Sequence, residues 1–322
     1  MKVAVIGLGS MGKRRIRLIK ELFPSYTIYG VDSREDRQKE AKELLGIDSF
    51  GNISDVPKDV TCAFVSTSPL SHAAIIKECL NNKWNVFTEI NLVDDGYEEN
   101  IELAKTNGCK LFLSSTFLYR EETKYIRSKI DQDHKWNYVY HVGQYLPDWH
   151  PWEKIGDYFV GNKRTNGCRE ILAIELPWLI KTFGPVSSVE SRSDKITELA
   201  IEYNDNFCIS VSHENGNKGM LVVDVVSPVA VRLFHAYTEG KYISWNGTPD
   251  SISEFDNEQK KLKKVELTED TEHIEGYSSF IVENAYKNEI KAFFNEVNNN
   301  VKAKYGFEDD LATLKVINSI GA

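Results

Sequence analysis

The sequence predicts an α/β protein: an N-terminal doubly wound parallel sheet, then a C-terminal α+β domain on an open, mostly antiparallel sheet. The length of 322 residues suggests about two domains. Up to residue 117, short apolar runs alternate with helical patterns, as in βαβ units. From residue 187 onward, apolar and polar residues alternate with period two, which is typical of antiparallel strands. We therefore expect domains at 1–117 and 118–322, with the last helix packed back on the first domain.

The chain begins with an apolar strand, a glycine-rich turn and an amphipathic helix. Val3–Ile6 forms the apolar run, and helical spacing of apolar residues follows over 16–23. In such a turn Gly7 allows the tight bend, Gly9 lets a pyrophosphate approach the backbone, and Gly12 lets helix and strand pack closely. The phosphates would lie at the helix N-terminus, where free N–H groups favour an anion. The alternative is a purely structural glycine turn. The expected cofactor contacts here are Gly7, Gly9, Ser10, Met11 and Gly12.

An acidic residue ends the second predicted strand, which covers 27–32. Asp32 is placed to accept hydrogen bonds from the ribose hydroxyls of the adenosine, which favours NAD over NADP. Arg34 leaves NADP open, because an arginine at this place can hold a 2′-phosphate. Ser33 completes this predicted contact segment. Arg14 and Arg15 open the first helix, and we expect them to face water rather than the pyrophosphate.

Further strands are predicted at 62–66, 84–88 and 110–114, and helices at 35–45, 71–80 and 97–106. Ligands of doubly wound sheets bind outside the carboxyl ends of the strands. The residues that follow these strands are therefore expected to contact the cofactor or the substrate: Ser66, Thr67, Ser68, Pro69, His72, Glu89 and Asn91. For His72, a structural role as a helix cap or a buried, hydrogen-bonded ring is the alternative.

The second part of the chain combines helices with alternating runs. We expect helices at 121–130, 171–183, 275–299 and 308–320, and strands at 138–145, 198–203, 207–213, 220–226 and 231–237. Between residues 146 and 169 the pattern is irregular and rich in aromatic residues. Trp149 and Trp152 are expected to stack on a sugar or base, or else to fix the loop. Lys163 and Arg164 are candidates for binding a substrate carboxylate or phosphate, or else are solvated charges.

Composition excludes several classes of partner and site. The formal net charge of −9 argues against nucleic acid and against an anionic membrane surface. No apolar run approaches the ~20 residues that a membrane helix needs. Five cysteines lie far apart without a CxxC spacing, which favours free thiols in a reducing cytoplasm over disulfides or a metal site.

Several motifs together resemble the Gfo/Idh/MocA oxidoreductase family. They are the opening Val5–Gly12 segment, the Val65–His72 segment that is similar to the family's TPxxxH element, and the C-terminal segments Asn288–Phe294 and Glu308–Leu311. The resemblance implies NAD(P) binding and a sugar-like or other small hydroxylated substrate. It also implies a homodimer or homotetramer assembled through the open face of the second sheet.

Two positions depart from the family pattern. Where the family has Glu-Lys-Pro, this chain has Glu-Ile-Asn with Ile90 in the place of the lysine, and where the family has Asp-x-x-x-His it has Glu170 and Ile174. Alcohol oxidation needs a group that takes the hydroxyl proton, and both usual carriers are missing. The candidate carriers, in order of preference, are Glu170, His150 and Tyr145, or water held by them. A dinucleotide-binding protein without redox turnover is the alternative.

Overall fold

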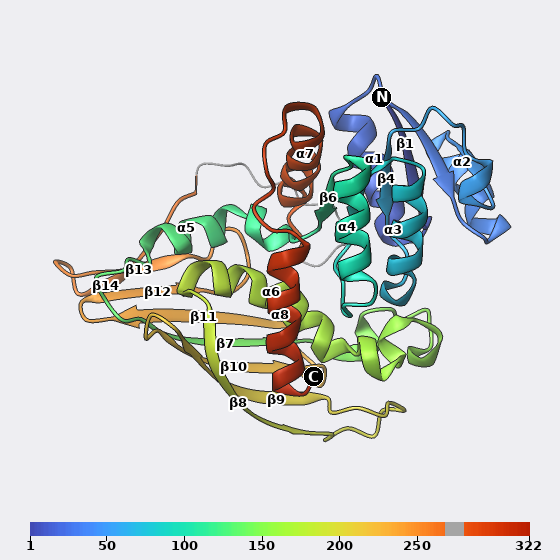
Figure 1. Ribbon diagram of the computed structural model, residues 1–322. Helices are drawn as coiled ribbons and strands as arrows, with labels where there is room; N and C mark the ends of the chain where they lie inside the picture. The colour runs from blue at the N-terminus through green and yellow to red at the C-terminus, as the bar shows by residue number, and fades with distance from the viewer. Residues whose placement is uncertain (268–279) are drawn as a thin grey trace. The chain divides into compact units, whose positions relative to one another are not determined.

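Two compact units, each built on its own sheet, make up the computed structural model, which describes residues 1–267 and 280–322 (Figure 1). Unit 1 comprises Met1–Ser115 and Tyr286–Leu311, and unit 2 comprises Thr116–Ala285 and Ala312–Ala322. The division therefore runs through the last two helices, and the sequence-based boundary at residue 117 describes only the first crossing between the units.

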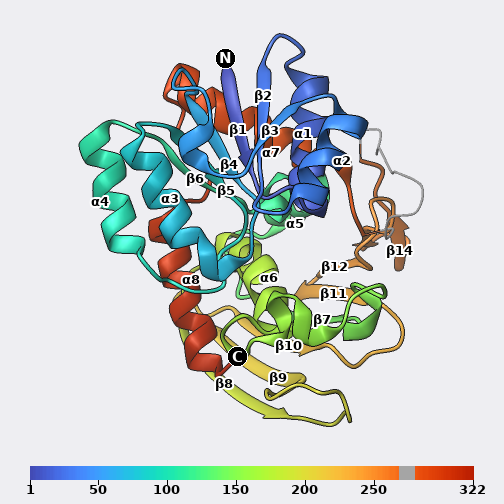
Figure 2. The same cartoon turned by 90° about the vertical axis from the view of Figure 1, so that its right-hand side faces the viewer.

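Unit 1 contains a six-stranded, fully parallel sheet in the order β3-β2-β1-β4-β5-β6 (Figure 2). Its strands are β1 (Lys2–Ile6), β2 (Thr27–Val31), β3 (Asp48–Phe50), β4 (Cys62–Val65), β5 (Asn85–Thr88) and β6 (Leu111–Leu113). The strand order changes direction between β1 and β4, and this is the switch point at which such sheets bind ligands.

Helices cover the parallel sheet: α1 (Ser10–Leu22), α2 (Glu35–Leu45), α3 (His72–Asn81), α4 (Tyr97–Asn107), most of α7 (Glu283–Asn299) and the first turn of α8 (Phe307–Ile320). One aromatic residue of α7 fixes that helix to three strands. The ring of Phe293 meets Phe64, Phe87 and Phe112 edge-on, with centroids 5.2, 5.7 and 5.8 Å away. Edge-to-face packing of this kind is the favoured geometry for buried rings.

Unit 2 contains an eight-stranded sheet in the order β14-β13-β12-β11-β7-β10-β9-β8. The strands are β7 (Asn137–Gly143), β8 (Val186–Asp194), β9 (Asn206–His213), β10 (Lys218–Asp224), β11 (Val231–Thr238), β12 (Lys241–Trp245), β13 (Ser253–Asp256) and β14 (Lys261–Lys264). Every neighbouring pair is antiparallel except β7 and β10, which are parallel. The predicted fold class, a doubly wound sheet followed by a mostly antiparallel one, is confirmed.

Only one face of the unit 2 sheet is buried. In β10, Leu221 and Val223 are buried whereas Met220 and Val222 are exposed, as the alternation of side chains along a strand requires. The helices α5 (Glu121–Lys129) and α6 (Gly167–Phe183) lie on the buried side (Figure 1). Short 3₁₀ helices complete the described chain: 53–55, 69–71 and 116–119, and four more between residues 146 and 165.

Several sequence-based boundaries were wrong. The predicted strand at 198–203 is irregular, because Asp205 draws that loop together by accepting hydrogen bonds from the backbone of Ile196 and Thr197. β3, β8 and β12–β14 were not predicted individually, and all of them except β12 have a low apolar content. α6 begins at Gly167 rather than 171, capped by the Asn166 side chain. Of the predicted helix 275–299, the first five residues lie outside the described part of the chain.

Candidate functional site

In the glycine turn after β1, packing within the protein requires glycine at positions 7 and 12 but not at position 9. A Cβ on Gly7 would lie 2.5 Å from the carbonyl oxygen of Ser66, and the φ of +91° already disfavours any other residue. A Cβ on Gly12 would lie 1.8 Å from the carbonyl oxygen of Gly7. On Gly9 the nearest atom is Nη1 of Arg37, 3.7 Å away. Packing within the protein therefore does not require glycine at position 9, where a pyrophosphate would approach, because a Cβ there would make only an ordinary van der Waals contact with Arg37.

The turn leads directly into α1, whose N-cap is Gly9 and has no side-chain cap. The first N–H groups of the helix, at Ser10, Met11 and Gly12, are therefore not used inside the helix and face the turn. Backbone donors together with the positive end of the helix dipole suit a phosphate group. No side chain competes for this position, so the geometry fits a dinucleotide.

Asp32 lies just after β2 and is largely buried. Its Oδ2 accepts a hydrogen bond from the backbone N–H of Leu8 (2.8 Å), and Oδ1 accepts one from the N–H of Arg34 (2.9 Å). Arg37 lies 3.5 Å away. These contacts orient the carboxylate toward the glycine turn, as a ribose-binding aspartate requires. The Arg34 side chain is exposed and paired with Asp36, and Ser33 is exposed.

The residues after β4 and β5 meet, as predicted for one edge of a parallel sheet. The Ser66 hydroxyl lies 3.3 Å from Oε1 of Glu89, and Gly7 packs against Ser66 and Thr67. The Ser71 hydroxyl, just beyond Ser68 and Pro69, donates to the carbonyl oxygen of Ser68 (2.7 Å) and lies 2.8 Å from Thr67 Oγ1. The structure thus gathers the predicted contact segments of unit 1 in one place. Their contact with cofactor or substrate stays a prediction.

The buried ring of His72 is held at both nitrogens. Nε2 lies 3.0 Å from the carbonyl oxygen of Thr67, and Nδ1 lies 2.6 Å from the side-chain amide of Asn91. Burial lowers the pKa of His72, so the ring is neutral and donates through one nitrogen only. Both neighbouring atoms are oxygens, the Thr67 carbonyl oxygen and Asn91 Oδ1, so the neutral ring donates its single N–H to one of them. This arrangement favours the structural alternative for His72.

Glu89 is tied to a buried arginine. Arg15 is 0% exposed and donates from Nε and Nη2 to the two oxygens of Glu89 at 2.7 and 2.8 Å. The same Nη2 lies 3.0 Å from Oε2 of Glu289 on α7, and Ser114 donates to Oε1 of Glu289 at 3.0 Å. Arg15 also lies over the ring of Phe87. We call Arg15, Glu89, Glu289 and Ser114 the arginine cluster.

The expectation that Arg14 and Arg15 face water was wrong, because both are buried. The helical pattern places them next to the apolar face of α1, but it does not reveal that acidic partners stand opposite. The partners come from β5 and α7, which are 74 and 274 residues away in the chain. A buried guanidinium is tolerated only with such partners.

Ile90 and Ile174 are both partly exposed. Ile90 follows Glu89 at the carboxyl edge of the unit 1 sheet, and Ile174 lies on α6 in unit 2. Neither position offers a proton carrier, as the sequence indicates.

The aromatic segment of unit 2, residues 146–169, has an inner part that is half-buried and an outer part that is exposed. Trp149 is half-buried, and its ring packs close to Gly167 at the start of α6. His150 stacks on Tyr158, with ring centroids 4.6 Å apart and 4° between the planes, and its Nδ1 lies 3.2 Å from Glu153. By contrast, Trp152 is 77% exposed. Tyr145, which is partly buried, precedes this segment, whereas Lys163 and Arg164 are exposed.

Two glutamates of α6 lie in different environments. Oε2 of Glu170 is buried without a hydrogen-bond partner among the described residues, and burial raises the pKa of this carboxyl to about 8. Glu175 is fully buried but accepts hydrogen bonds from Tyr140 (2.7 Å), Trp178 (2.7 Å) and Arg232 (2.6 Å). The carboxylate of Glu175 therefore has a structural role, because its oxygens already accept hydrogen bonds. Of these two glutamates of α6, Glu170 is the one that can exchange a proton.

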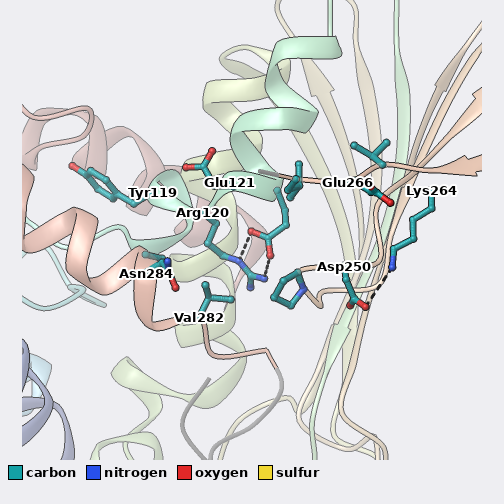
Figure 3. A pocket seen from close by; sticks show the side chains of 13 residues that line it. Tyr119, Arg120, Glu121, Asp250, Lys264, Glu266, Val282 and Asn284 are labelled. Carbon is teal, nitrogen blue, oxygen red and sulfur yellow. Dashed lines mark hydrogen bonds and ion pairs between the residues drawn. The ribbon is translucent and has the colours of Figure 1, made fainter. Parts of the chain in front are cut away.

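A cavity of about 360 Å³ in unit 2 is lined by none of the predicted site residues. Its charged side chains point toward one another: Arg120 to Glu122, and Lys264 to Asp250 (Figure 3). Glu121 is paired with Lys124. Because these charges already have partners, we assign the cavity no function.

The described residues contain neither a metal-binding cluster nor a membrane-spanning helix. No group of three or more His, Cys, Asp or Glu side chains there could hold a metal ion. No helix in the same residues is long and apolar enough to cross a membrane.

Residues 1–115 match the model of the oxidoreductase family with the NAD-binding Rossmann fold. Myo-inositol 2-dehydrogenase of Thermotoga maritima is 27% identical over 139 residues, which are 41% of this chain and 41% of that protein. The match therefore spans about two fifths of the length of this curated relative.

Solved structures share the fold over the whole chain. An NAD-binding oxidoreductase from Klebsiella pneumoniae has a TM-score of 0.80 at 13% identity, covering 100% of this chain and 96% of that one. The WlbA dehydrogenase of Bordetella pertussis, solved with NADH and UDP-GlcNAcA, has a TM-score of 0.76 at 13% identity, covering 100% and 95%. At such identities the likeness shows a common fold.

Proposed function

We propose that this chain, whose residues 1–115 match the oxidoreductase family with the NAD-binding Rossmann fold, is an NAD(P)-dependent dehydrogenase of the Gfo/Idh/MocA family that acts on the CH–OH group of a sugar, nucleotide sugar or similar hydroxylated compound. The observation that carries the proposal is the glycine turn, with a glycine at position 9 that packing does not require and the free N–H groups of α1. The relatives described as an inositol dehydrogenase and as a complex with UDP-GlcNAcA support the substrate class.

Asp32 supports NAD as the preferred cofactor, because a carboxylate at the ribose repels a 2′-phosphate. Arg34 is paired with Asp36, which supports the same preference. When bound, the nicotinamide supplies or accepts the hydride. The chain itself has to carry the hydroxyl proton.

Glu170 is the proposed proton carrier. A carboxyl whose pKa is about 8 holds its proton at neutral pH and releases it slightly above. In the oxidation of an alcohol, the ionised carboxylate accepts the hydroxyl proton, while the carbon-bound hydrogen leaves as hydride. In the reverse reaction the protonated carboxyl returns it. His150 and Tyr145 are the alternative carriers in the same unit.

The first test separates cofactor binding from folding at the glycine turn. We expect Gly9→Ala to leave the free energy of unfolding within about 0.5 kcal/mol of the wild type, because its Cβ has room. We expect the same variant to weaken NAD binding at least about tenfold in calorimetry, because the methyl group fills the phosphate position. Unchanged NAD affinity in Gly9→Ala would contradict the proposal.

The second test concerns turnover. Polyols, sugars and nucleotide sugars are screened with NAD, and NADH absorbance is followed. We expect Glu170→Gln to lower kcat by roughly 10²-fold or more, the usual share of general acid–base catalysis. Glu202→Gln is the control, because Glu202 is exposed in the same unit.

A dinucleotide-binding protein without turnover is the second candidate, and Ile90 and Ile174 are the observations that favour it. It predicts that NADH raises the melting temperature, that no substrate is converted, and that Glu170→Gln changes nothing. In that case Ile90→Lys, which restores an ammonium group, is expected to create measurable activity if only the proton relay is missing.

The open face of the unit 2 sheet supports a homodimer or homotetramer. Exposed apolar side chains lie on three adjacent strands: Val139 on β7, Met220 and Val222 on β10, and Leu233 and Tyr237 on β11. Such a face is typical of an interface. We expect Met220→Asp to lower the mass measured by analytical ultracentrifugation. The five unpaired cysteines support a cytoplasmic location.

A further inference from the structure

Of the side chains of unit 2 that bury a polar atom without a partner among the described residues, three lie around the start of α6. They are the indole Nε1 of Trp149, the hydroxyl of Tyr158 and the Oε2 of Glu170. An unsatisfied buried donor or acceptor destabilises a protein by about 1–3 kcal/mol. Such groups are rare in folded proteins, and several of them together indicate a place where another molecule binds.

The three groups are neighbours. The ring of Trp149 lies 3.5 Å from the position of a Cβ on Gly167, the first residue of α6. Glu170 lies three residues further on the same face of this helix, since residues i and i+3 are adjacent. Tyr158 lies close enough to Glu170 for the carboxylate charge to raise the pKa of its phenol, with burial as the larger cause.

The surroundings hold these groups in place. A Cβ on Gly167 would lie 2.9 Å from Val225 and 3.1 Å from Leu146, so only glycine lets the loop approach the helix this closely. His150 stacks flat on Tyr158 and is itself fixed by Glu153. The orientation of Tyr158 is therefore set by packing and not by a hydrogen bond of its own hydroxyl.

We propose that Trp149, Tyr158 and Glu170 form a hydroxyl-binding site for a polyol or sugar, in which Tyr158 is a substrate-binding residue. This inference rests on the proposed function and adds to it a residue that neither the sequence pattern nor the comparisons single out. The chemistry matches, because an indole N–H donates only, whereas a phenol and a protonated carboxyl each donate and accept. A substrate hydroxyl both donates and accepts, so adjacent hydroxyls of one ring can satisfy all three.

The binding test uses the protein saturated with NADH, which forms a dead-end complex with an alcohol and allows no turnover. Calorimetry with myo-inositol and with UDP-GlcNAcA gives the affinity. We expect Tyr158→Phe and Trp149→Phe each to weaken binding of the probe that the wild type prefers by about tenfold, the loss expected for one hydrogen bond to a desolvated group. Tyr125→Phe, a half-buried tyrosine of α5, is the matched control and is expected to bind as the wild type does.

A stability measurement distinguishes a binding role from a structural one. Because the Tyr158 hydroxyl has no partner, Tyr158→Phe is expected to keep or raise the melting temperature of the protein without substrate. Weaker probe binding together with an unchanged or higher melting temperature supports the inference. A lower melting temperature, or an unchanged affinity, overturns it.

The proposed function and this inference can fail separately. If NADH does not bind, the proposed function fails at its first step. If NADH binds and alcohols are oxidised but Tyr158→Phe has wild-type affinity, only the inference fails. If NADH binds but neither probe binds the wild type, the hydroxyl-binding site is refuted, and the dinucleotide site stands.

Discussion

Two sites, the arginine cluster of unit 1 and Glu170 of unit 2, bury ionisable groups in opposite ways. In unit 1, the arginine cluster surrounds Arg15 with two carboxylates and a hydroxyl, all between 2.7 and 3.3 Å away. In unit 2, Glu170 is buried with an oxygen that has no partner among the described residues, beside a phenol in the same condition. The first arrangement stabilises the fold. The second destabilises it and leaves hydrogen-bonding capacity available.

The difference indicates where chemistry takes place. A partnered carboxylate such as Glu89 is held by Arg15 and has little freedom to move a proton. Burial also raises the pKa of Glu289, although Arg15 beside it acts in the opposite direction. An unpartnered carboxyl such as Glu170 has a pKa near the working pH and no competing bond. Perturbed groups without partners are characteristic of functional sites.

The largest expected effect is on Arg15. Replacing it by methionine removes the buried guanidinium that faces the carboxylates of Glu89 and Glu289, and we expect the free energy of unfolding in urea to fall by about 3–5 kcal/mol. Lys20→Met, at an exposed position of the same helix, is the control and is expected to change it by less than about 0.5 kcal/mol. A loss below about 1 kcal/mol for Arg15→Met would show that the cluster is not needed for stability.

The second prediction concerns Glu170, whose replacement is expected to raise stability, in contrast to that of Arg15. The pKa of Glu170 is raised from its ordinary value of 4.5 to about 8, so the folded protein binds one more proton than the unfolded chain between these pH values. Stability contributed by this proton is complete below pH 4.5 and is lost as the pH rises toward 8. Glu170→Gln stays neutral, so we expect its melting temperature to exceed that of the wild type at pH 8 but not at pH 4.5. Equal pH profiles for the two proteins would refute this.

A smaller effect is expected at two adjacent serines of unit 1. The Ser114 hydroxyl donates to Glu289, whereas the Ser115 hydroxyl is buried without a partner among the described residues. We expect Ser114→Ala to lower the free energy of unfolding by about 1 kcal/mol, and Ser115→Ala to leave it unchanged or raise it slightly. If both variants lose the same amount, the hydrogen bond of Ser114 is not the cause.

The smallest effect is expected at Trp152. This residue is 77% exposed, so we expect Trp152→Ala to change the melting temperature by no more than about 2 °C. A larger loss would show that Trp152 packs in solution and would move it into the inner part of the aromatic segment beside Trp149.

Local patterns were enough to predict much of the fold. The predicted bounds of α2 agree with the structure, and those of β4, α3, α4 and α8 agree within one residue, because apolar spacing and the surrounding turns determine them. The strand predicted at 198–203 failed for the opposite reason. Apolar and polar residues do alternate there. However, the Asp205 side chain accepts hydrogen bonds from the backbone of Ile196 and Thr197, and an alternating pattern cannot predict such bonds.

The candidate site was predicted less completely. Gly7, Asp32 and Ser66 lie where a doubly wound sheet requires, since their places follow from strand ends. Tyr158 was not predicted, because it lies in an irregular segment without periodicity and its meaning depends on Glu170 nearby. Arg15 was predicted to face water, because the sequence of α1 alone does not indicate that an acidic partner lies opposite it.

The sequence by itself determined the strand–turn–helix that suits a dinucleotide, since three glycines at fixed spacing constrain the backbone locally. It also determined the parallel and antiparallel sheets, through the length and period of their apolar runs. Only the tertiary structure decided which buried charges have partners. Arg15 meets Glu289 from 274 residues away, whereas Oε2 of Glu170 meets no partner in the part of the chain that the structure describes, and such long-range pairing depends on how the elements pack.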